Sequence, residues 1–445
     1  MRSDHLSLVR PCRRSRISIC RVLLATIASL ATGSSAIAAA PMFEENIVWK
    51  DKEDGMLTYH VPTIFVTDKD TVLAAADARF NDYGDFDPHH LVLKRSTDGS
   101  RSWGPNTYVA RSDGRNIYLF PNFIQARDSA RIFMFYSEKS LENIHTITHI
   151  WLRHSDDDGV TWSEPVDVSP ILVRADAELK RALEAGTAGP PFQGRHYDAD
   201  RFSQENSSLY GRRSFYSGPG VAIQLSRHHP HAPSRLIIPF LNMQRRDAPH
   251  IQRGHGNCFL ISDDNGATWK AGGIVPIGRY VNSEPSVVEL ADGDLLMNAR
   301  YEGRTDRVIS RSRDGGLTWS QSEIDSTIPK FMETHAGLLR LSHPKDDPTG
   351  RSRVLFSFPD CQNARERMTV MLSYDEHRSW PVRKVVNFGA SFYSNMARLS
   401  DGTVILVYGK GQTEHRWMPA TTVVARFNLE WLTDGKDSLA TGPKR

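Results

Sequence analysis

Acidic side chains recur along this chain in a fixed pattern, and such a pattern can either bind a cation or cap a turn. The pattern, Ser-x-Asp-x-Gly-x-Thr/Ser-Trp, occurs five times and ends at Trp103, Trp162, Trp269, Trp319 and Trp380. Acid-rich copies such as residues 156–159 resemble a calcium-binding loop, but the glutamate that completes such a loop is missing downstream. We therefore predict that each aspartate accepts hydrogen bonds from N–H groups of its own turn.

Two other segments hold residue types that can do chemistry. The segment His228-His-Pro-His231 has the composition of a metal site, but its proline and the following alanine are typical of a loop. We interpret it as a solvated turn, and we predict no metal and no other cofactor. A second segment contains three acids, Asp82, Asp85 and Asp87, any of which could cap a turn. The register to the next predicted strand favours Asp85 as a functional group.

The elements that position these residues follow from the repeat. The tryptophans are separated by 59, 107, 50 and 61 residues, so the long interval is predicted to hold one unit without the pattern. The glycine of the pattern supplies a positive φ, although the first and last copies carry Ser100 and His377 there. Strand-like apolar runs precede the copies. A period of about 50 residues with strand–turn–strand content predicts an all-β fold, a β-propeller.

Only one segment has a clear helical pattern, residues 176–185, which ends before Gly186. It lies in the long interval, next to a stretch rich in Gly, Pro and Ser. We predict one propeller domain over residues 41–435, with an insertion at about 170–217 and a tail at 436–445. The insertion is expected to lie between strands and could overhang the site.

The first forty residues differ in composition from the rest of the chain. They hold six arginines, one acid (Asp4), an apolar run at residues 22–31 and small residues up to Ala40. This layout predicts an export signal and a periplasmic or extracellular protein, with an uncut membrane anchor as the alternative. The net charge is +3 for the whole chain and −2 without this segment, which gives no support for a nucleic-acid or membrane-surface partner. Cys258 and Cys361 are predicted to be two buried thiols, with a disulfide as the alternative.

The five acidic boxes resemble the Asp-box signature of the sialidase (neuraminidase) family, and the resemblance extends over about residues 44–430. Motifs between the boxes are similar to those of sialidases, in the same order: Asp77-Ala-Arg79 followed by Asp85, Ser217-Gly-Pro-Gly220, Asn282-Ser-Glu284, Asn298-Ala-Arg300, Pro359 through Arg365, and Phe392-Tyr-Ser394. The resemblance implies a six-bladed β-propeller whose active site lies on the face opposite the boxes.

The same resemblance implies roles for individual residues. Asp85 matches the general acid/base, Tyr393 the nucleophile, Glu284 the base that takes the tyrosine proton, Arg300 and Arg365 two of three arginines that clamp the substrate carboxylate, and Arg79 an arginine at the pocket rim. A phenol suits this task because the substrate carries a carboxylate on its anomeric carbon, and that carboxylate would repel an anionic nucleophile. Arginine suits the clamp because its planar fork binds carboxylate with two hydrogen bonds.

Two positions depart from the sialidase pattern. His60 stands where the family has the first clamp arginine, and Gly409 stands where it has the glutamate that braces that arginine. Two interpretations of His60 stay open: a cation in mildly acidic solution that pairs with the substrate carboxylate, or a neutral ring that hydrogen-bonds a sugar hydroxyl.

The predicted function is an exo-α-sialidase-like, retaining glycosidase that hydrolyses terminal sialic acid, or a related acidic sugar, from glycans. One alternative is a glycosidase or lyase for another ketosugar or uronic acid. A second alternative is a carbohydrate-binding propeller without turnover, which would need the arginines but not the Tyr393–Glu284 pair.

Overall fold

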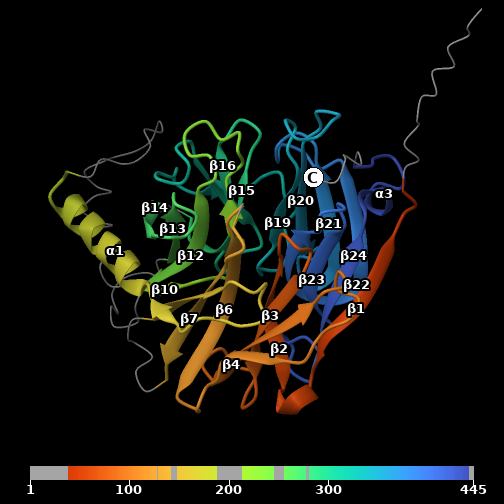
Figure 1. Cartoon of the computed structure of the whole chain (residues 1–445), viewed down its shortest axis with the longest axis horizontal. Coiled ribbons are helices and arrows are strands. Elements are labelled where there is room, and N and C mark those ends of the chain that lie inside the picture. The colour runs from red at the N-terminus through yellow and green to blue at the C-terminus, as the bar shows by residue number, and fades with distance from the viewer. Residues whose placement is uncertain are drawn as a thin grey trace, which may run out of the picture. The chain divides into compact units, whose positions relative to one another are not determined.

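A computed structural model describes residues 39–127, 129–141, 148–187, 213–244, 255–276 and 280–439 (Figure 1). The predicted export signal lies outside these residues except for its last two positions. So does most of the Gly/Pro/Ser-rich part of the predicted insertion. No helix in the described part of the chain is long and apolar enough to cross a membrane.

Most described strands belong to successive antiparallel groups, which we call the first to the sixth unit. The first holds β2 (Thr58–Val66), β3 (Val72–Arg79), β4 (His89–Ser96) and β5 (Thr107–Ala110), and the second β6 (Asn116–Gln125), β7 (Ile132–Ser140), β8 (His149–Ser155) and β9 (Val166–Asp167). The third holds β10 (Arg213–Tyr216), β11 (Ile223–Gln224), β12 (Leu236–Gln244), β13 (His255–Ser262) and β14 (Lys270–Ile274). The fourth holds β15 (Asn282–Glu289), β16 (Leu295–Tyr301), β17 (Arg307–Ser312) and β18 (Glu323–Ile324).

The last two units share one long strand, β22 (Val382–Arg398). Its first half pairs with β21 (Glu366–Ser373), next to β20 (Arg353–Pro359) and β19 (Gly337–Ser342), and its second half pairs with β23 (Val404–Lys410). The sixth unit continues through β24 (Thr421–Phe427) to β1 (Phe43–Lys50), so the first strand of the described chain completes the last unit. The predicted all-β class is confirmed, whereas the number of blades in a closed ring stays a prediction.

The acidic boxes form the turns that the sequence predicts. In the second box, Asp157 accepts from the backbone N–H of Thr161 at 2.8 Å and from its hydroxyl at 2.6 Å. The N–H of Gly159 donates to Ser155 Oγ at 2.8 Å, and Gly159 has φ +81°. The two copies without glycine keep the same backbone, because Ser100 and His377 both have φ +71°.

His377 shows what one departure from glycine adds. Its side chain is buried and its Nε2 lies 2.7 Å from Asp325 Oδ2 in the fourth unit. The fifth box is therefore tied to the preceding unit by a polar contact, in addition to its tryptophan.

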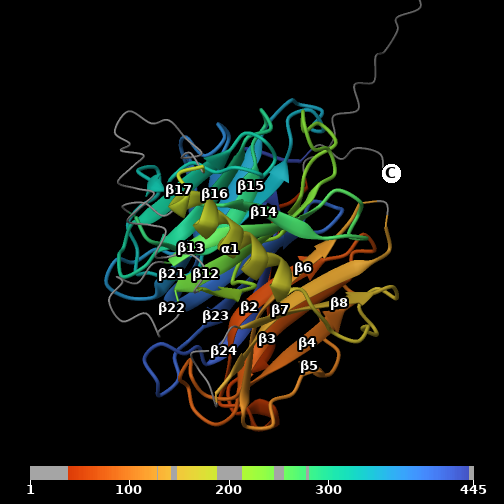
Figure 2. The same ribbon diagram turned by 90° about the vertical axis from the view of Figure 1, so that its left-hand side faces the viewer.

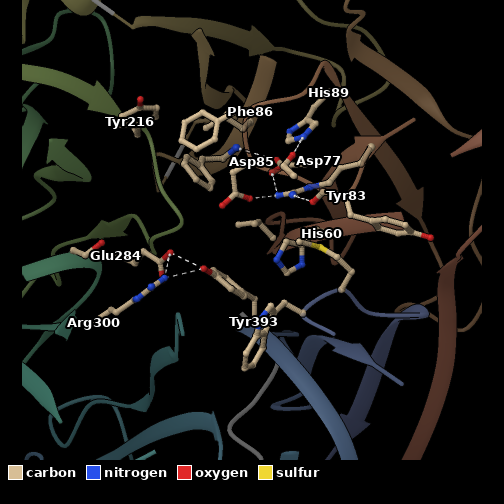
Figure 3. A pocket seen from close by; sticks show the side chains of 18 of the residues that line it. His60, Asp77, Tyr83, Asp85, Phe86, His89, Tyr216, Glu284, Arg300 and Tyr393 are labelled. Carbon is tan, nitrogen blue, oxygen red and sulfur yellow. Dashed lines mark hydrogen bonds and ion pairs between the residues drawn. The ribbon is translucent and has the colours of Figure 1, made fainter. Parts of the chain in front are cut away.

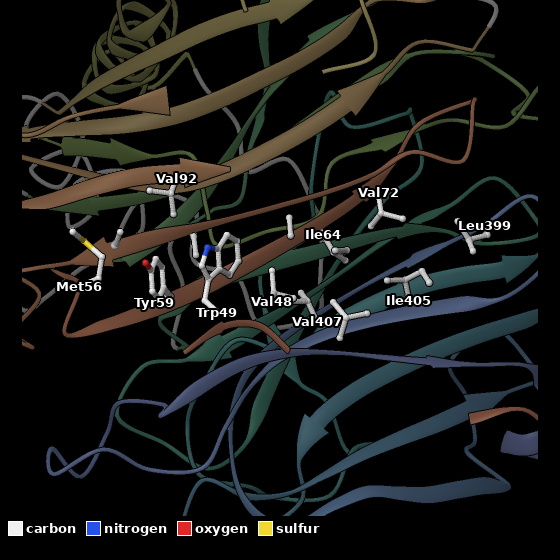
Figure 4. Close-up of a cluster of buried hydrophobic side chains, with 14 residues drawn as sticks. Val48, Trp49, Met56, Tyr59, Ile64, Val72, Val92, Leu399, Ile405 and Val407 are labelled. Atoms are coloured by element: carbon white, nitrogen blue, oxygen red, sulfur yellow. The ribbon is translucent and has the colours of Figure 1, made fainter. Parts of the chain in front are cut away.

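The core consists of apolar clusters that fill the space between neighbouring units. One cluster combines Trp49 and Val48 of β1 with Ile64 of β2, Val72 of β3 and Val407 of β23 (Figure 4). The box tryptophans extend such clusters: Trp319 is 1% exposed and stacks on Phe259 of the third unit, with ring centres 4.4 Å apart. Burying these rings against the next unit is the main apolar contribution of the boxes to stability.

The helix is longer than the sequence predicts. It is α1 (Ser169–Glu184), and it begins seven residues before the predicted start. Asp167 accepts from the N–H of Ser169 at 2.9 Å, and Pro170 fits a first helical turn because it has no N–H to satisfy. The helix packs across β8, β10 and β14, on the outer side of those strands (Figures 1 and 2). Two short helices, η1 (Glu53–Gly55) and α3 (Leu429–Leu432), complete the described elements.

No disulfide joins Cys258 and Cys361, as the sequence analysis expected. Cys258 is buried in β13, but Cys361 lies beyond the end of β20 and is partly exposed. The prediction that both thiols are buried is therefore wrong for Cys361, because the strand that precedes it ends at Pro359.

Neighbouring units approach each other closely at a box, and this contact predicts how much an added methyl group lowers the free energy of unfolding. A Cβ on Gly266, whose φ is +86°, would lie 2.2 Å from the Phe133 ring, whereas a Cβ on Gly350, with φ +67°, would meet no atom within 4 Å. Gly350→Ala carries only the backbone strain and should cost about 1 kcal/mol, while Gly266→Ala adds the clash and should cost at least about 2 kcal/mol more. Urea unfolding of both variants measures the difference, and equal losses would contradict the close packing of box and ring.

Candidate active site

A pocket of about 580 Å³ lies at the ends of the strands opposite the acidic boxes. Its wall includes residues from the β3–β4, β16–β17 and β20–β21 connections, each of which joins the second and third strands of a unit. The boxes follow the third strands, and antiparallel strands place these two kinds of connection at opposite ends. The predicted separation of pocket and boxes is thus present in the structure.

Irregular strand pairing aims three site residues into this pocket. The register of β2 against β3 shifts just after His60, that of β15 against β16 shifts across Glu284, and that of β22 against β23 shifts across Tyr393. Such bulges turn a side chain out of the regular alternation of a strand. β2 and β15 are the first strands of their units, and the second half of β22 is the first strand of the sixth unit. The three side chains therefore face the same pocket (Figure 3).

The centre of the site is a contact between a phenol, a carboxylate and a guanidinium. The hydroxyl of Tyr393 donates to Glu284 Oε1 at 2.7 Å. One nitrogen of Arg300 lies 3.1 Å from the same Glu284 oxygen and 3.2 Å from the Tyr393 oxygen (Figure 3). Tyr393 is 7% exposed and Glu284 6%. Burial, and then the charge of Glu284, raise the pKa of Tyr393 far above its ordinary value, so the phenol is neutral in the free protein.

The two predicted clamp arginines differ in how their charge is satisfied. Arg300 faces three carboxylates, those of Glu284, Glu302 and Glu333, at 3.1 to 3.5 Å. Arg365 donates to the backbone oxygen of Glu333 at 2.9 Å, and its buried Nε has no hydrogen-bond partner among the described residues. Its guanidinium lies over the rings of Tyr393 and Trp417, at 5.4 and 5.3 Å. In the described chain no carboxylate pairs with Arg365, so no side-chain charge neutralises its guanidinium.

Asp85 and Arg79 form an ion pair on another part of the wall. Arg79 is 2% exposed and donates to the backbone oxygen of Tyr83 at 2.5 Å, while its other terminal nitrogen lies 2.9 Å from Asp85. The Asp85 side chain is 74% exposed. Desolvation acts to raise its pKa, but the Arg79 charge outweighs it and holds the pKa below the ordinary value. The structure thus brings Asp85 to the pocket as a carboxylate.

His60 is a buried pocket residue whose surroundings disfavour a positive charge. It is 4% exposed and meets the Tyr393 ring edge-on, with ring centres 5.0 Å apart. Burial, and then the charges of Arg79 and Arg365, lower the pKa of His60 well below its ordinary value. Burial and the nearby arginines therefore favour the interpretation of His60 as a neutral ring over that of a cation.

The packing around Gly409 leaves no room for the glutamate that the sialidase pattern has there. A Cβ at Gly409 would lie 2.9 Å from Pro419 and 3.0 Å from Phe392, so a glutamate does not fit there. The loss of the arginine at residue 60 and of its glutamate partner is thus built into the packing of the sixth unit.

Glu333 lines the pocket and was not singled out from the sequence. It comes from the long connection before β19, which has no periodic pattern. His335, from the same connection, stacks beside Tyr393, with ring centres 6.4 Å apart. Asp77 also lines the pocket; it belongs to a motif that the sequence analysis named, but no role was given to it there. Asp77 is 1% exposed, and burial raises its pKa to about 8 against the opposing charge of Arg79. Its spacing of two residues from Arg79 on one strand was a usable signal, since such residues share a face.

Sequence comparison gives a consistent set of relatives. A family model described as "BNR repeat-like domain" matches residues 192–406. The chain is 29% identical over 435 residues to a sialidase of Micromonospora viridifaciens, covering 92% of this chain and 58% of that protein. It is 22% identical to a sialidase of Bacteroides fragilis, of which it covers 60%, and 25% identical to an exo-alpha-sialidase of Arthroderma benhamiae, covering 86% of both chains. The chain thus spans about three-fifths of the two bacterial relatives.

Solved structures show the same fold. "Hadza microbial sialidase Hz136" superposes with a TM-score of 0.64 at 20% identity, over 86% of this chain and 68% of that one. A leech intramolecular trans-sialidase superposes with a TM-score of 0.65 at 16% identity, over 89% of this chain and 71% of that one. At these identities the structural likeness establishes the fold.

The buried histidines of the site predict how stability depends on pH. Burial is the main cause that lowers the pKa of His335 to about 3, whereas an unfolded histidine titrates near pH ~6.5. Below pH ~6.5 the unfolded chain binds a proton that the native chain excludes, so this residue should lower the unfolding free energy by up to about 1.4 kcal/mol per pH unit. His335→Gln should make the fall in stability between pH 6.5 and 4.5 shallower by about that amount, measured by urea unfolding. The exposed control His231→Gln should leave the slope unchanged, and an unchanged slope in His335→Gln would contradict a neutral, buried His335.

Proposed function

We propose that this chain is a sialidase-family glycosidase that removes a terminal acidic sugar from glycans, because its sequence and fold are similar to those of sialidases over most of its length. The observation that carries the proposal is the contact of Tyr393 with Glu284 at 2.7 Å, in a pocket where Arg365 has no carboxylate partner among the described residues. A nucleophile with its base, next to a site for an anion, is the arrangement that an acidic glycoside needs.

The charges of the pocket support an acidic sugar. Arg300 is balanced by carboxylates of its own wall, and Arg79 by Asp85. The substrate carboxylate is expected to bind Arg365, the pocket arginine without a carboxylate partner among the described residues, with two parallel hydrogen bonds. Trp417, over which Arg365 lies, covers one face of this guanidinium and limits its access to water.

We propose the following course for the reaction. Tyr393 Oη attacks the anomeric carbon while its proton passes to Glu284, so the phenol becomes anionic only as the bond to carbon forms. Asp85 gives a proton to the leaving oxygen as the glycosidic bond breaks. Water, losing its proton to Asp85, then attacks the anomeric carbon of the glycosyl–tyrosine intermediate, an aryl glycoside, and Glu284 returns its proton to the departing Tyr393 oxygen. Two displacements at the same carbon give net retention of configuration. Because Asp85 is a carboxylate in the free protein, it must take up its proton when the bound sugar excludes water from its surroundings.

The identity of the sugar depends on His60. Sialic acid is the default substrate of the proposal, and a related ketosugar acid or a uronic acid is the alternative. The neutral ring of His60 offers a hydrogen bond where the sialidase pattern has a third arginine, which favours a substrate that needs only two cations. A binding protein without turnover would have no use for the Tyr393–Glu284 contact.

We also propose that the protein is exported and acts on glycans in the periplasm or outside the cell. The support is the arginine-rich segment with its apolar run before residue 40.

A panel of aryl glycosides tests the proposed activity. We expect phenol release from α-glycosides of 2-keto acids, such as sialic acid, and none from the matched neutral hexosides, because Arg365 requires a carboxylate. Proton NMR during turnover should show the α-anomer as the first product, as retention demands. Turnover of uronides alone, an unsaturated product, or a β-anomer formed first would each contradict the proposal and point to the alternative glycosidase or lyase.

A further inference from the structure

The segment His228-His-Pro-His231 is only in part the solvated turn that the sequence predicts, because Pro230 and His231 are exposed but His229 is buried and His228 is partly buried. His229 is 3% exposed, and its Nδ1 accepts from the backbone N–H groups of His231 and Ala232, at 3.2 and 2.9 Å. His228 is only 31% exposed, and its Nε2 lies 2.8 Å from Asp346 Oδ1, in the connection between β19 and β20. The prediction failed for His228 because its partner lies more than a hundred residues further along the chain.

A second imidazole completes the cluster. His343 begins the same connection as Asp346, and its ring lies against that of His228, with ring centres 5.2 Å apart and planes 22° apart. One ligand atom from each of His228, His343 and Asp346 lies within 4.8 Å of the other two. From this geometry we propose that the three residues form a zinc-binding site.

The separation of the rings fits zinc. Tetrahedral Zn²⁺ binds imidazole nitrogens at about 2.0–2.1 Å, which places the centres of two bound rings about 5 Å apart. Two imidazoles and one carboxylate are a ligand set that zinc accepts, with a water molecule as the fourth ligand. Calcium and magnesium prefer a shell of oxygen atoms, so the two imidazoles select against them.

The surroundings hold the three ligands in place before a cation arrives. Ser226 donates through its N–H and its hydroxyl to Glu289 at the end of β15, at 2.5 and 2.7 Å, and its Oγ accepts from the N–H of His228 at 3.2 Å. The N–H groups of Asp346 and Asp347 both donate to the carbonyl of His343, at 3.0 and 2.9 Å. This tight turn keeps His343 and Asp346 on one side of the connection.

The position of His343 favours a ligand role as well. His343 is 7% exposed, so the surrounding chain fixes its ring next to that of His228. Its Nδ1 accepts a long hydrogen bond of 3.2 Å from the N–H of Lys345. Zinc at Nε2 moves the ring proton to Nδ1, and that weak bond is given up.

The site lies on the box side of the protein, away from the pocket. His228 belongs to the third unit, and His343 and Asp346 belong to the fifth, while Ser226 is anchored on β15 of the fourth. A zinc ion here therefore links the third unit to the fifth, next to the Ser226–Glu289 contact with the fourth, and its role is structural, independent of the proposed reaction.

Titration of the chelator-treated, full-length protein with Zn²⁺ in a calorimeter tests the site. We expect about one equivalent to bind, and His343→Ala and Asp346→Asn to weaken binding at least about tenfold. The exposed His231→Ala is the matched control and should bind like the native chain. Co²⁺ provides an independent readout, since four-coordinate cobalt should give strong visible absorption that both ligand variants lose.

Thermal unfolding separates a lost ligand from a lost fold. Zn²⁺ should raise the melting temperature of the native chain and of His231→Ala by a few degrees and leave that of the ligand variants unchanged. Asp346 is largely exposed, so Asp346→Asn should fold even if His343→Ala does not. The absence of zinc binding in the native chain, or equal binding in Asp346→Asn and the native chain, would overturn the proposal.

Discussion

The buried contact between Tyr393, Glu284 and Arg300 is the constraint on which the rest of the pocket depends. A carboxylate that is 6% exposed is costly unless it is paired, and Arg300 pairs with it at 3.1 Å. The same guanidinium touches the Tyr393 oxygen at 3.2 Å, so one cation fixes both partners of the proposed proton transfer. Glu302 and Glu333 also form ion pairs with Arg300, so the charge of Arg300 is neutralised within the protein. Arg365 has no such partner among the described residues and is the arginine proposed to bind an incoming anion.

The two ends of the strands have different roles in this arrangement. At one end the acidic boxes satisfy their own backbone groups and bury their tryptophans, so those turns are rigid and locally specified. At the other end the strands carry bulges at His60, Glu284 and Tyr393, and these point side chains from different units into one pocket. Tyr393 stands where β22 passes from the fifth unit to the sixth, so the strand that joins the two units also carries the proposed nucleophile.

The sequence predicted features that depend on neighbouring residues, but it did not predict contacts between residues that are far apart along the chain. The boxes and the all-β class follow from patterns a few residues long, and the resemblance to sialidases pointed to Asp85, Glu284, Arg300, Arg365 and Tyr393, which lie in one pocket. The neutral state of His60 depends on burial and on Arg79 and Arg365, which are distant in sequence. Likewise, Glu333 and the partner of His228 are set by connections without periodicity, and the early start of α1 depends on a cap by Asp167 that the helical pattern does not include.

A double-mutant cycle on Tyr393 and Glu284 tests most directly whether the two act as one unit. With the glycoside that the protein turns over, Tyr393→Phe and Glu284→Gln should each lower kcat by at least about 10³-fold, and the double variant should lose little more than either single variant. Tyr301 is a partly buried tyrosine outside the pocket wall, and its ring meets that of Tyr280 edge to face. Tyr301→Phe is therefore the control for removing a hydroxyl. Losses that multiply to about 10⁶-fold in the double variant, with all variants folded, would show two independent groups and contradict a base-activated phenol.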